Sequence, residues 1–319
     1  MSTAVLTLRP VRRVRLGPAL AGLIVAAFVG WSVAAGVILC EAAFHTPMEA
    51  RRPAPIESAR ALAHEFGGSV RDAGILSFDS VPLRGWLFEP GHPNGAAVIL
   101  FHGMADSRAS SLPYARVLLG HGYTVLAADE RGNGASGGAI STFGALERYD
   151  THYWANWLFT RQRIVRLYGL GESMGAGILL ESLDAEPRFR AVVAESAFAD
   201  FRTIAYDRLS QHFGTRLGLG PLLYAGVVEG GSIYAWGRYG IDLDRISPEN
   251  AVARTRVPIL LIHGQADVNV YPYHAHRIAS RNPAHVSLWE PPLTCHTCAV
   301  GSQPEEFERR VIGWFQSHP

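Results

Sequence analysis

The clearest chemical candidate in this sequence is a serine between glycines, in the stretch GLGESMGAG. Gly171 and Gly175 stand two residues to either side of Ser173, which fits the pattern G-x-S-x-G. The flanking residues predict a strand at 164–168 and a helix at 174–183. A serine on a sharp strand-to-helix turn needs small neighbours, because its backbone is strained and crowded. This context favours a nucleophilic serine over a glycine-rich turn that serine merely caps.

A nucleophilic serine of this kind needs an acid and a histidine, which follow it along the chain in that order. Asp267 follows the buried strand predicted at 257–262, and His296 follows the strand predicted at 286–290. Both residues therefore fall at the carboxyl ends of parallel strands, where open α/β sheets place their sites. We predict that His296 takes the Ser173 proton and that Asp267 orients the imidazole.

Other residues compete for these two roles. The rival histidines lie on a predicted helix, before a strand, or at the strand end ahead of Asp267, and they are His274, His276, His285 and His263. The rival acid is Asp200, which follows the strand predicted at 191–195. Asp267 is preferred because the stretch HGQAD follows directly after the end of its predicted strand.

Donors for a developing oxyanion are the remaining requirement. The stretch FHGMADSR ends the strand predicted at 96–101 with His102, Gly103 and Met104. The backbone N–H groups of Met104 and of Met174, the residue after the serine, are the expected donors. His102 and Gly103 alone would be a routine strand-end turn, so this prediction depends on the other elements.

The stretch TCHTC places His296 between Cys295 and Cys298 and raises other kinds of chemistry. These three residues are too close together to supply three ligands to a tetrahedral zinc site, and the sequence contains no His-Glu-x-x-His. The cysteine pair is compatible with a small disulfide that stiffens the histidine loop and equally with two reduced thiols. We predict no metal at this site.

A dinucleotide-binding interpretation of GLGESMGAG is also disfavoured. The glycine fingerprint of such sites belongs to the first βαβ unit, and an acid follows it by about twenty residues. Here two strands precede the motif, and Glu195 matches the acid only loosely. We therefore predict no cofactor.

The elements that must position these residues alternate between strands and helices. An alternating hairpin near 74–90 precedes buried strands at 96–101 and 123–129, and helices are predicted at 144–160 and 305–316. This succession predicts an α/β fold with a mostly parallel central sheet and helices on both faces. The apolar segment 202–245 is too long for a plain crossover. We interpret it as a helical cap insertion, in preference to ordinary packing or a second membrane span.

The N-terminus has a different composition. Residues 16–40 contain no charge, and a helix of 25 residues spans about 37 Å, enough to cross a bilayer. Arginines lie before this run and Glu41 follows it, so we expect the N-terminus in the cytoplasm and the remainder on the extracytoplasmic side. The alternative is a signal peptide that is cleaved to give a secreted protein, although its apolar region is usually only about 7–15 residues long.

This organisation divides the chain into four parts. They are a basic N-terminus at 1–15, a transmembrane helix or signal anchor at 16–40, a linker at 41–68 and an α/β domain at 69–319.

Composition limits the function classes. The 319 residues include 29 basic and 28 acidic residues with a net charge of +1, so no global field recruits nucleic acid. Every basic residue is arginine, which excludes Schiff-base chemistry and a P-loop lysine. Three cysteines exclude a disulfide-stapled scaffold.

Five stretches in this order and spacing resemble the serine α/β-hydrolase superfamily: FHGMADSRASS, AADERGNGASGG, GLGESMGAGILL, LLIHGQADVNV and CHTCA. They look most like the branch that groups small bacterial esterases, prolyl-oligopeptidase-like hydrolases and membrane-anchored relatives of lipid-directed hydrolases. The resemblance covers about residues 70–318. It implies a Ser–His–Asp triad at Ser173, His296 and Asp267, with oxyanion donors at Met104 and Met174.

The same resemblance implies that the run containing Asp129 and Arg131 shapes a loop beside the active site. The sequence departs from the family pattern at Cys295, where a small residue, frequently glycine, is usual. It also carries the insertion 202–245, which minimal members lack.

The predicted function is hydrolysis of a carboxylic ester with a small, lipid-like acyl substrate, at a membrane reached through the N-terminal helix. A peptidase of the same fold is the first alternative. A non-catalytic, membrane-tethered binding module is the second. No prediction is made of the oligomeric state.

Overall fold

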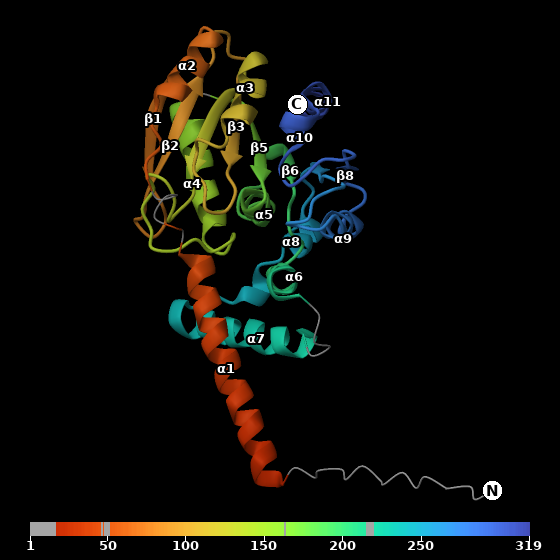
Figure 1. Cartoon of the computed structure of the whole chain (residues 1–319). Coiled ribbons are helices and arrows are strands. Elements are labelled where there is room, and N and C mark those ends of the chain that lie inside the picture. The colour runs from red at the N-terminus through yellow and green to blue at the C-terminus, as the bar shows by residue number, and fades with distance from the viewer. Residues whose placement is uncertain (1–16, 46, 48–51, 163, 215–219) are drawn as a thin grey trace, which may run out of the picture.

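The computed structural model describes residues 17–45, 47, 52–162, 164–214 and 220–319. The basic N-terminus predicted at 1–15 lies outside these residues. Figure 1 shows a central sheet between layers of helices, with the long helix α1 projecting away from one end.

Eight strands form one sheet in the order β1-β2-β4-β3-β5-β6-β7-β8. β1 pairs antiparallel with β2, β2 pairs antiparallel with β4, and the remaining pairs are parallel. The predicted mostly parallel α/β fold is confirmed. The strands are β1 (Ser69–Leu76), β2 (Pro82–Glu89), β3 (Ala96–Phe101), β4 (Thr124–Asp129), β5 (Arg166–Glu172), β6 (Phe189–Glu195), β7 (Ile259–Ile262) and β8 (Val286–Trp289).

Two hydrophobic cores lie on opposite faces of the sheet, because successive side chains of a strand point to opposite sides. Along β3, Ala97 and Ile99 belong to one core, whereas Val98 and Leu100 belong to the other. The Ala97 side is covered by α4 (Glu147–Arg161), α5 (Met174–Glu181), α8 (Pro248–Arg254) and α9 (Tyr273–Arg281). The Val98 side is covered by α2 (Glu57–Glu65), α3 (Leu112–Gly120) and α11 (Pro304–Gln316).

Two predicted boundaries within the α/β domain were wrong by several residues. β5 continues to Glu172 instead of ending at 168, because its glycines pair with β3 and β6 although they lack strand-forming side chains. α4 begins at Glu147 instead of 144. The Glu147 carboxylate accepts hydrogen bonds from the N–H groups of Thr142 and Gly144, which holds the preceding residues in a turn.

The segment predicted as a helical insertion contains α6 (Phe201–Phe213), α7 (Gly220–Tyr239) and the short helix η1 (Leu243–Arg245). α6 and α7 lie at the end of the domain from which α1 projects (Figure 1).

α1 (Pro18–Phe44) is the one helix of the described residues that is long and apolar enough to cross a membrane. Most of its side chains are exposed, and the buried ones, Ser32, Gly36, Cys40 and Phe44, follow at intervals of four residues. The helix does not end at 40 as predicted. It continues to Phe44, because the ring of Phe44 is buried and packs on Tyr239. The segment predicted as a linker therefore begins with the last turn of this helix.

Candidate active site

The turn between β5 and α5 holds Ser173 in a strained conformation, with φ at 52° and ψ at −117°. A Cβ atom on Gly171 would lie 2.5 Å from the carbonyl oxygen of Gly175, and one on Gly175 would lie 2.4 Å from the carbonyl oxygen of Phe101. The Ser173 N–H donates to the backbone oxygen of Glu195 on β6 at 2.8 Å. The glycines are thus required by direct backbone contact on both sides of the serine.

Ser173, His296 and Asp267 meet at the carboxyl edge of the sheet, from three separate loops. The Nε2 atom of His296 lies 2.8 Å from the Ser173 hydroxyl oxygen. Its Nδ1 atom lies 2.8 Å from Oδ2 of Asp267. In the tautomer that carries the proton on Nδ1, His296 donates to Asp267 and is positioned to accept the serine proton.

The environment of Asp267 keeps it ionised. Its side chain is fully buried, and its Oδ1 atom accepts hydrogen bonds from the N–H groups of Asn269 and Val270 at 2.9 Å each. Burial alone would raise the pKa of the Asp267 carboxyl. Hydrogen bonds from His263 and His296 more than offset this and hold that pKa well below its usual range. His263, a rival histidine in sequence, thus lies against the acid and not against the serine.

The loop after β3 lies directly beside the serine, since a Cβ atom on Gly103 would lie 3.7 Å from the Ser173 Cβ. The His102 Nδ1 atom lies 2.8 Å from the carbonyl oxygen of Gly103. Because a trans peptide is planar, this contact fixes the N–H of Met104 in the opposite direction, away from the His102 ring. Neither Met104 N–H nor Met174 N–H has an acceptor among the described residues. Both predicted donors therefore remain available.

His102 is itself fully buried against Glu130. The Glu130 carboxylate accepts a hydrogen bond from the His102 N–H at 2.9 Å and forms an ion pair with the ring. Burial disfavours the imidazolium, but the neighbouring carboxylate outweighs it and raises the pKa of His102 above its ordinary value. This pair supports the loop behind the predicted oxyanion site.

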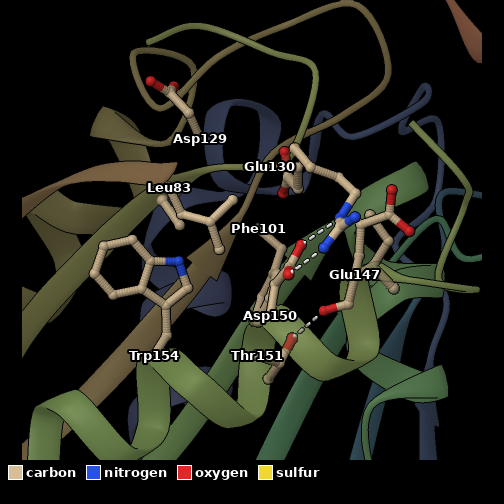
Figure 2. A pocket seen from close by; sticks show the side chains of 11 residues that line it. Leu83, Phe101, Asp129, Glu130, Glu147, Asp150, Thr151 and Trp154 are labelled. Carbon is tan, nitrogen blue, oxygen red and sulfur yellow. Dashed lines mark hydrogen bonds and ion pairs between the residues drawn. The ribbon is translucent and has the colours of Figure 1, made fainter. Parts of the chain in front are cut away.

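Asp129 and Arg131, predicted to lie in a loop beside the site, organise that loop from within. Asp129 accepts hydrogen bonds from the N–H groups of Arg108 and Ala135, at 2.8 Å each. Arg131 donates to both oxygens of Asp150, and both residues line a small pocket, in which Figure 2 shows Asp150. None of these hydrogen bonds reaches Ser173, Asp267 or His296.

The rival residues have structural partners elsewhere. His274 contacts Asp207, His276 contacts Glu290, and Asp200 caps α6 and pairs with Arg277. His285 hydrogen-bonds within its own loop to Asn282.

A buried carboxyl cluster that the sequence did not indicate lies beneath the serine. The Tyr114 hydroxyl lies 3.0 Å from Glu172 and 3.0 Å from Glu195. The tyrosine hydroxyl can donate its single hydrogen to only one of the two carboxyl groups. In the other contact, a protonated carboxyl must donate to the tyrosine oxygen. Burial raises the pKa of the Glu195 carboxyl to about 7, which makes it the group able to carry that proton near neutral pH. No local motif in the sequence indicates this meeting of α3, β5 and β6.

The Cys295–Cys298 pair, left open by the sequence, forms a disulfide around His296. Among the described residues, no group of three or more His, Cys, Asp or Glu side chains has the arrangement of a metal site.

The chain is similar to two bacterial proteins whose names state no activity. "Uncharacterized protein YqkD" of Bacillus subtilis is 29% identical over 188 residues, which cover 58% of this chain and 59% of that protein. "Uncharacterized protein YfhR" of Escherichia coli K12 is 29% identical over 222 residues, which cover 66% of this chain and 68% of that protein. The chain thus spans about three fifths to two thirds of these relatives.

The family and structural matches point to hydrolases. A family model described as "Serine aminopeptidase, S33" matches residues 92–218. The esterase Pf2001 of Pyrococcus furiosus superposes with a TM-score of 0.69 at 25% identity, covering 86% of this chain and 97% of that one. The fold is that of an α/β hydrolase, and these matches support the serine α/β-hydrolase superfamily. The α/β hydrolase GrgF of Penicillium sp. sh18 shares the fold, with a TM-score of 0.60 at 20% identity, and covers 78% of this chain and 98% of its own.

Proposed function

We propose that this hydrolase cleaves carboxylic esters by two-step acyl transfer through Ser173, His296 and Asp267. The observation that carries the proposal is the position of His296, whose two ring nitrogens lie 2.8 Å from the serine hydroxyl and 2.8 Å from the Asp267 carboxylate. This is the spacing that a general base needs in order to activate a nucleophile.

In the first step His296 accepts the Ser173 proton while the serine oxygen bonds to the ester carbonyl carbon. The carbonyl electrons move to the oxygen, which the N–H groups of Met104 and Met174 stabilise. The intermediate collapses, and the alkoxide leaves with the proton that His296 returns. In the second step His296 activates a water, which releases the carboxylic acid and restores Ser173.

An ester is favoured over a peptide by the surroundings of the serine. Exposed apolar side chains come from three of the loops that meet at the site: Met104, Val268 and Leu293. Apolar side chains on these loops suit an acyl chain more than a charged peptide. The structural similarity to the P. furiosus esterase supports the same choice.

Peptide hydrolysis is the second candidate, supported by the aminopeptidase description of the family model that matches residues 92–218. A panel of unlabelled dipeptides and a series of p-nitrophenyl esters of increasing chain length, given to the same enzyme, separate the two. Release of amino acids without ester turnover would replace the ester proposal.

The decisive test compares wild-type protein with Ser173→Ala, using the full chain in detergent. We expect labelling by a fluorophosphonate probe and turnover of p-nitrophenyl butyrate in the wild type. We expect neither labelling nor more than about a thousandth of the turnover in the variant. Ser280→Ala, at an exposed position of α9, is the matched control and retains both. Equal activity of wild type and Ser173→Ala would exclude the mechanism, and an unlabelled, inactive wild type would favour a binding module.

We also propose that α1 anchors the enzyme in a membrane with the domain on the extracytoplasmic side. The exposed apolar surface of α1 supports an anchor, and the disulfide at Cys295–Cys298 suits an oxidising compartment. Protease added to intact spheroplasts should digest the domain. Protection until lysis would place the domain in the cytoplasm, and recovery of a soluble, shortened protein would indicate a cleaved signal peptide.

A further inference from the structure

We propose that α7 is a lipid-contacting helix, which α1 holds along the outer boundary of the bilayer with Leu222, Ile233 and Trp236 in the lipid. The partner of this surface is the membrane itself. The inference rests on the proposed membrane span of α1, and its test does not depend on the proposed catalytic reaction.

The two helices cross in direct backbone contact. A Cβ atom on Gly36 of α1 would lie 2.4 Å from the backbone nitrogen of Gly231 and 2.5 Å from the backbone oxygen of Val227. A Cβ atom on Gly226 would lie 2.5 Å from the Ser32 hydroxyl oxygen. Small residues at such a crossing allow close packing even inside a membrane, where the hydrophobic effect does not drive helices together.

Polar and aromatic contacts fix the orientation of α7 on α1 one turn beyond the crossing. The Glu41 carboxylate accepts hydrogen bonds from the hydroxyl groups of Tyr234 at 2.7 Å and Tyr239 at 2.5 Å. The rings of Phe44 and Tyr239 lie 5.5 Å apart. α7 therefore cannot move away from α1 without breaking several contacts.

The position of the crossing along α1 sets the depth of α7. Ser32 and Gly36 follow Pro18 by 14 and 18 residues, which correspond to about 21 and 27 Å of helix. The hydrocarbon core of a bilayer is about 30 Å thick. If α1 begins to span near Pro18, the crossing falls about 3 to 9 Å inside the far boundary of the core. α7, which is about 10 Å across, then lies close to the boundary between the acyl chains and the headgroups.

The side chains of α7 fit this position. Tyr224, Val227 and Val228 pack in a small apolar cluster with Leu209 of α6. Leu222, Ile233 and Trp236 point away from that cluster and are 62%, 61% and 68% exposed. Tryptophan is enriched at membrane interfaces, and the contiguous exposed residues of α1 are also apolar.

One charged pair lies along the same side of α7. Glu229 is exposed and forms an ion pair with Arg202 of α6 at 3.1 Å. A paired charge is compatible with the headgroup boundary and would be costly in the middle of the core. The pair therefore favours a helix that lies in the interface over one that is buried deeply.

The cap also connects α7 to the catalytic loops. On α6, the Gln211 side chain donates to the backbone oxygen of Val268 at 2.9 Å, next to Asp267. α6 thus links the lipid-contacting helix to the loop of Asp267, and α6 and α7 lie at the end of the domain from which α1 projects (Figure 1).

The test measures the depth of a fluorescent label in phosphatidylcholine and phosphatidylglycerol vesicles that contain the full chain. An environment-sensitive NBD dye is attached to Ile233→Cys in a Cys40→Ser background, since the other two cysteines form a disulfide. We expect nitroxide lipids labelled near the headgroup to quench this dye at least twofold more than lipids labelled deep in the chain. Aqueous iodide should quench it at least threefold less than it quenches a free dye.

The matched control is Val165→Cys, which is 68% exposed and lies just before β5, at the amino ends of the parallel strands. Its dye should respond to iodide and not to nitroxide lipids. If the Ile233→Cys dye behaves like this control, α7 does not contact lipid and the proposal fails. Quenching by neither agent would also overturn it, since a protein partner would then cover the helix. Quenching by iodide and quenching by nitroxide lipids are both independent of whether Ser173 is catalytic.

A second pair of variants tests whether α1 holds the helix in place. Gly36→Val forces the crossing apart, whereas Gly30→Val has no neighbour within 4 Å of the added carbon. In the Ile233→Cys background we expect Gly36→Val to reduce lipid quenching at least twofold and Gly30→Val to leave it unchanged. Equal quenching in both would show that α1 does not position α7.

Discussion

The serine turn and the histidine loop bring their reactive groups to the same point by different means. In the serine turn, Gly171 packs on the backbone of Gly175, and Gly175 packs on the backbone of Phe101 and His102, so neither glycine has space for a side chain. The turn is supported by distant backbone, but the serine and glycines that mark it lie within one short stretch. The sequence therefore reveals this turn directly.

The histidine loop depends on residues far away in the chain. The Ala299 N–H donates to the Glu195 carboxylate at 2.9 Å, and the Thr297 N–H donates to the Ser196 hydroxyl at 3.2 Å. The Cys295–Cys298 disulfide adds a local constraint around His296. This loop should thus tolerate single changes better than the serine turn, since several separate contacts share its support.

The largest effect is expected from Gly175→Ala in the serine turn. The added carbon would lie 2.4 Å from the Phe101 oxygen and 2.5 Å from the His102 oxygen, and neither backbone group can move easily. We expect a loss of about 3 kcal/mol or more in the free energy of unfolding. Turnover of p-nitrophenyl butyrate should fall by at least about 100-fold, since the misplaced groups carry the chemistry. Urea denaturation and initial rates measure both.

Gly313→Ala on α11 is the matched control for this change. The added carbon has no neighbour within 4 Å, so stability should stay the same or rise by up to about 1 kcal/mol. A Gly175→Ala variant as stable and active as Gly313→Ala would show that the serine turn is not constrained as described.

A smaller effect is expected from removing the disulfide, in the double variant Cys295→Ser and Cys298→Ser. Closing so short a loop contributes about 2 kcal/mol to stability through the unfolded chain. Because His296 lies inside the loop, we expect kcat to fall about tenfold while KM is unchanged. Ester kinetics and urea denaturation, with and without reductant on the wild type, measure these changes.

Cys40→Ser controls for effects of reductant on the free cysteine. Thiol titration of the denatured, unreduced wild type should find one thiol per chain. Three free thiols would show that the disulfide does not form, and full activity of the double variant would show that it does not support His296. Neither result would contradict the contact between His296 and Ser173.

The smallest effect on turnover, and the most specific effect on stability, concerns Glu195, which joins the two regions. Its folded pKa, raised to about 7 by burial, lies above the ordinary value of 4.5. Its contribution to stability is therefore full below about pH 4.5 and is lost as the pH rises through about 7. Glu195→Gln is neutral throughout and should gain up to about 3 kcal/mol relative to the wild type over this interval. Denaturation at pH 5 and pH 8 measures the difference.

The retained amide oxygen of Glu195→Gln can still accept from Ala299, so its activity at pH 6 should change little. Glu195→Ala, which removes that acceptor, should lower both stability and turnover. A stability difference between wild type and Glu195→Gln that does not change with pH would mean that the carboxyl is ionised in the folded protein.

Much of the fold could be predicted because its signals are periodic and local. Continuous apolar runs indicated the strands, and the alternation of strands and helices indicated the parallel sheet, which the structure confirms. The start of α4 and the end of β5 were not predicted correctly. A carboxylate that caps a turn and glycines that pair inside a sheet leave no mark on hydrophobic periodicity.

The sequence by itself determined the order of serine, acid and histidine and their positions after strands, because parallel strands bring their carboxyl ends to one edge of the sheet. It also determined an apolar helix at the N-terminus. Only the tertiary structure decided what supports these parts. The contacts of Tyr114 with Glu172 and Glu195 and the crossing of α1 with α7 join residues that are distant along the chain. Such contacts depend on three-dimensional packing and have no spacing that a sequence pattern could reveal.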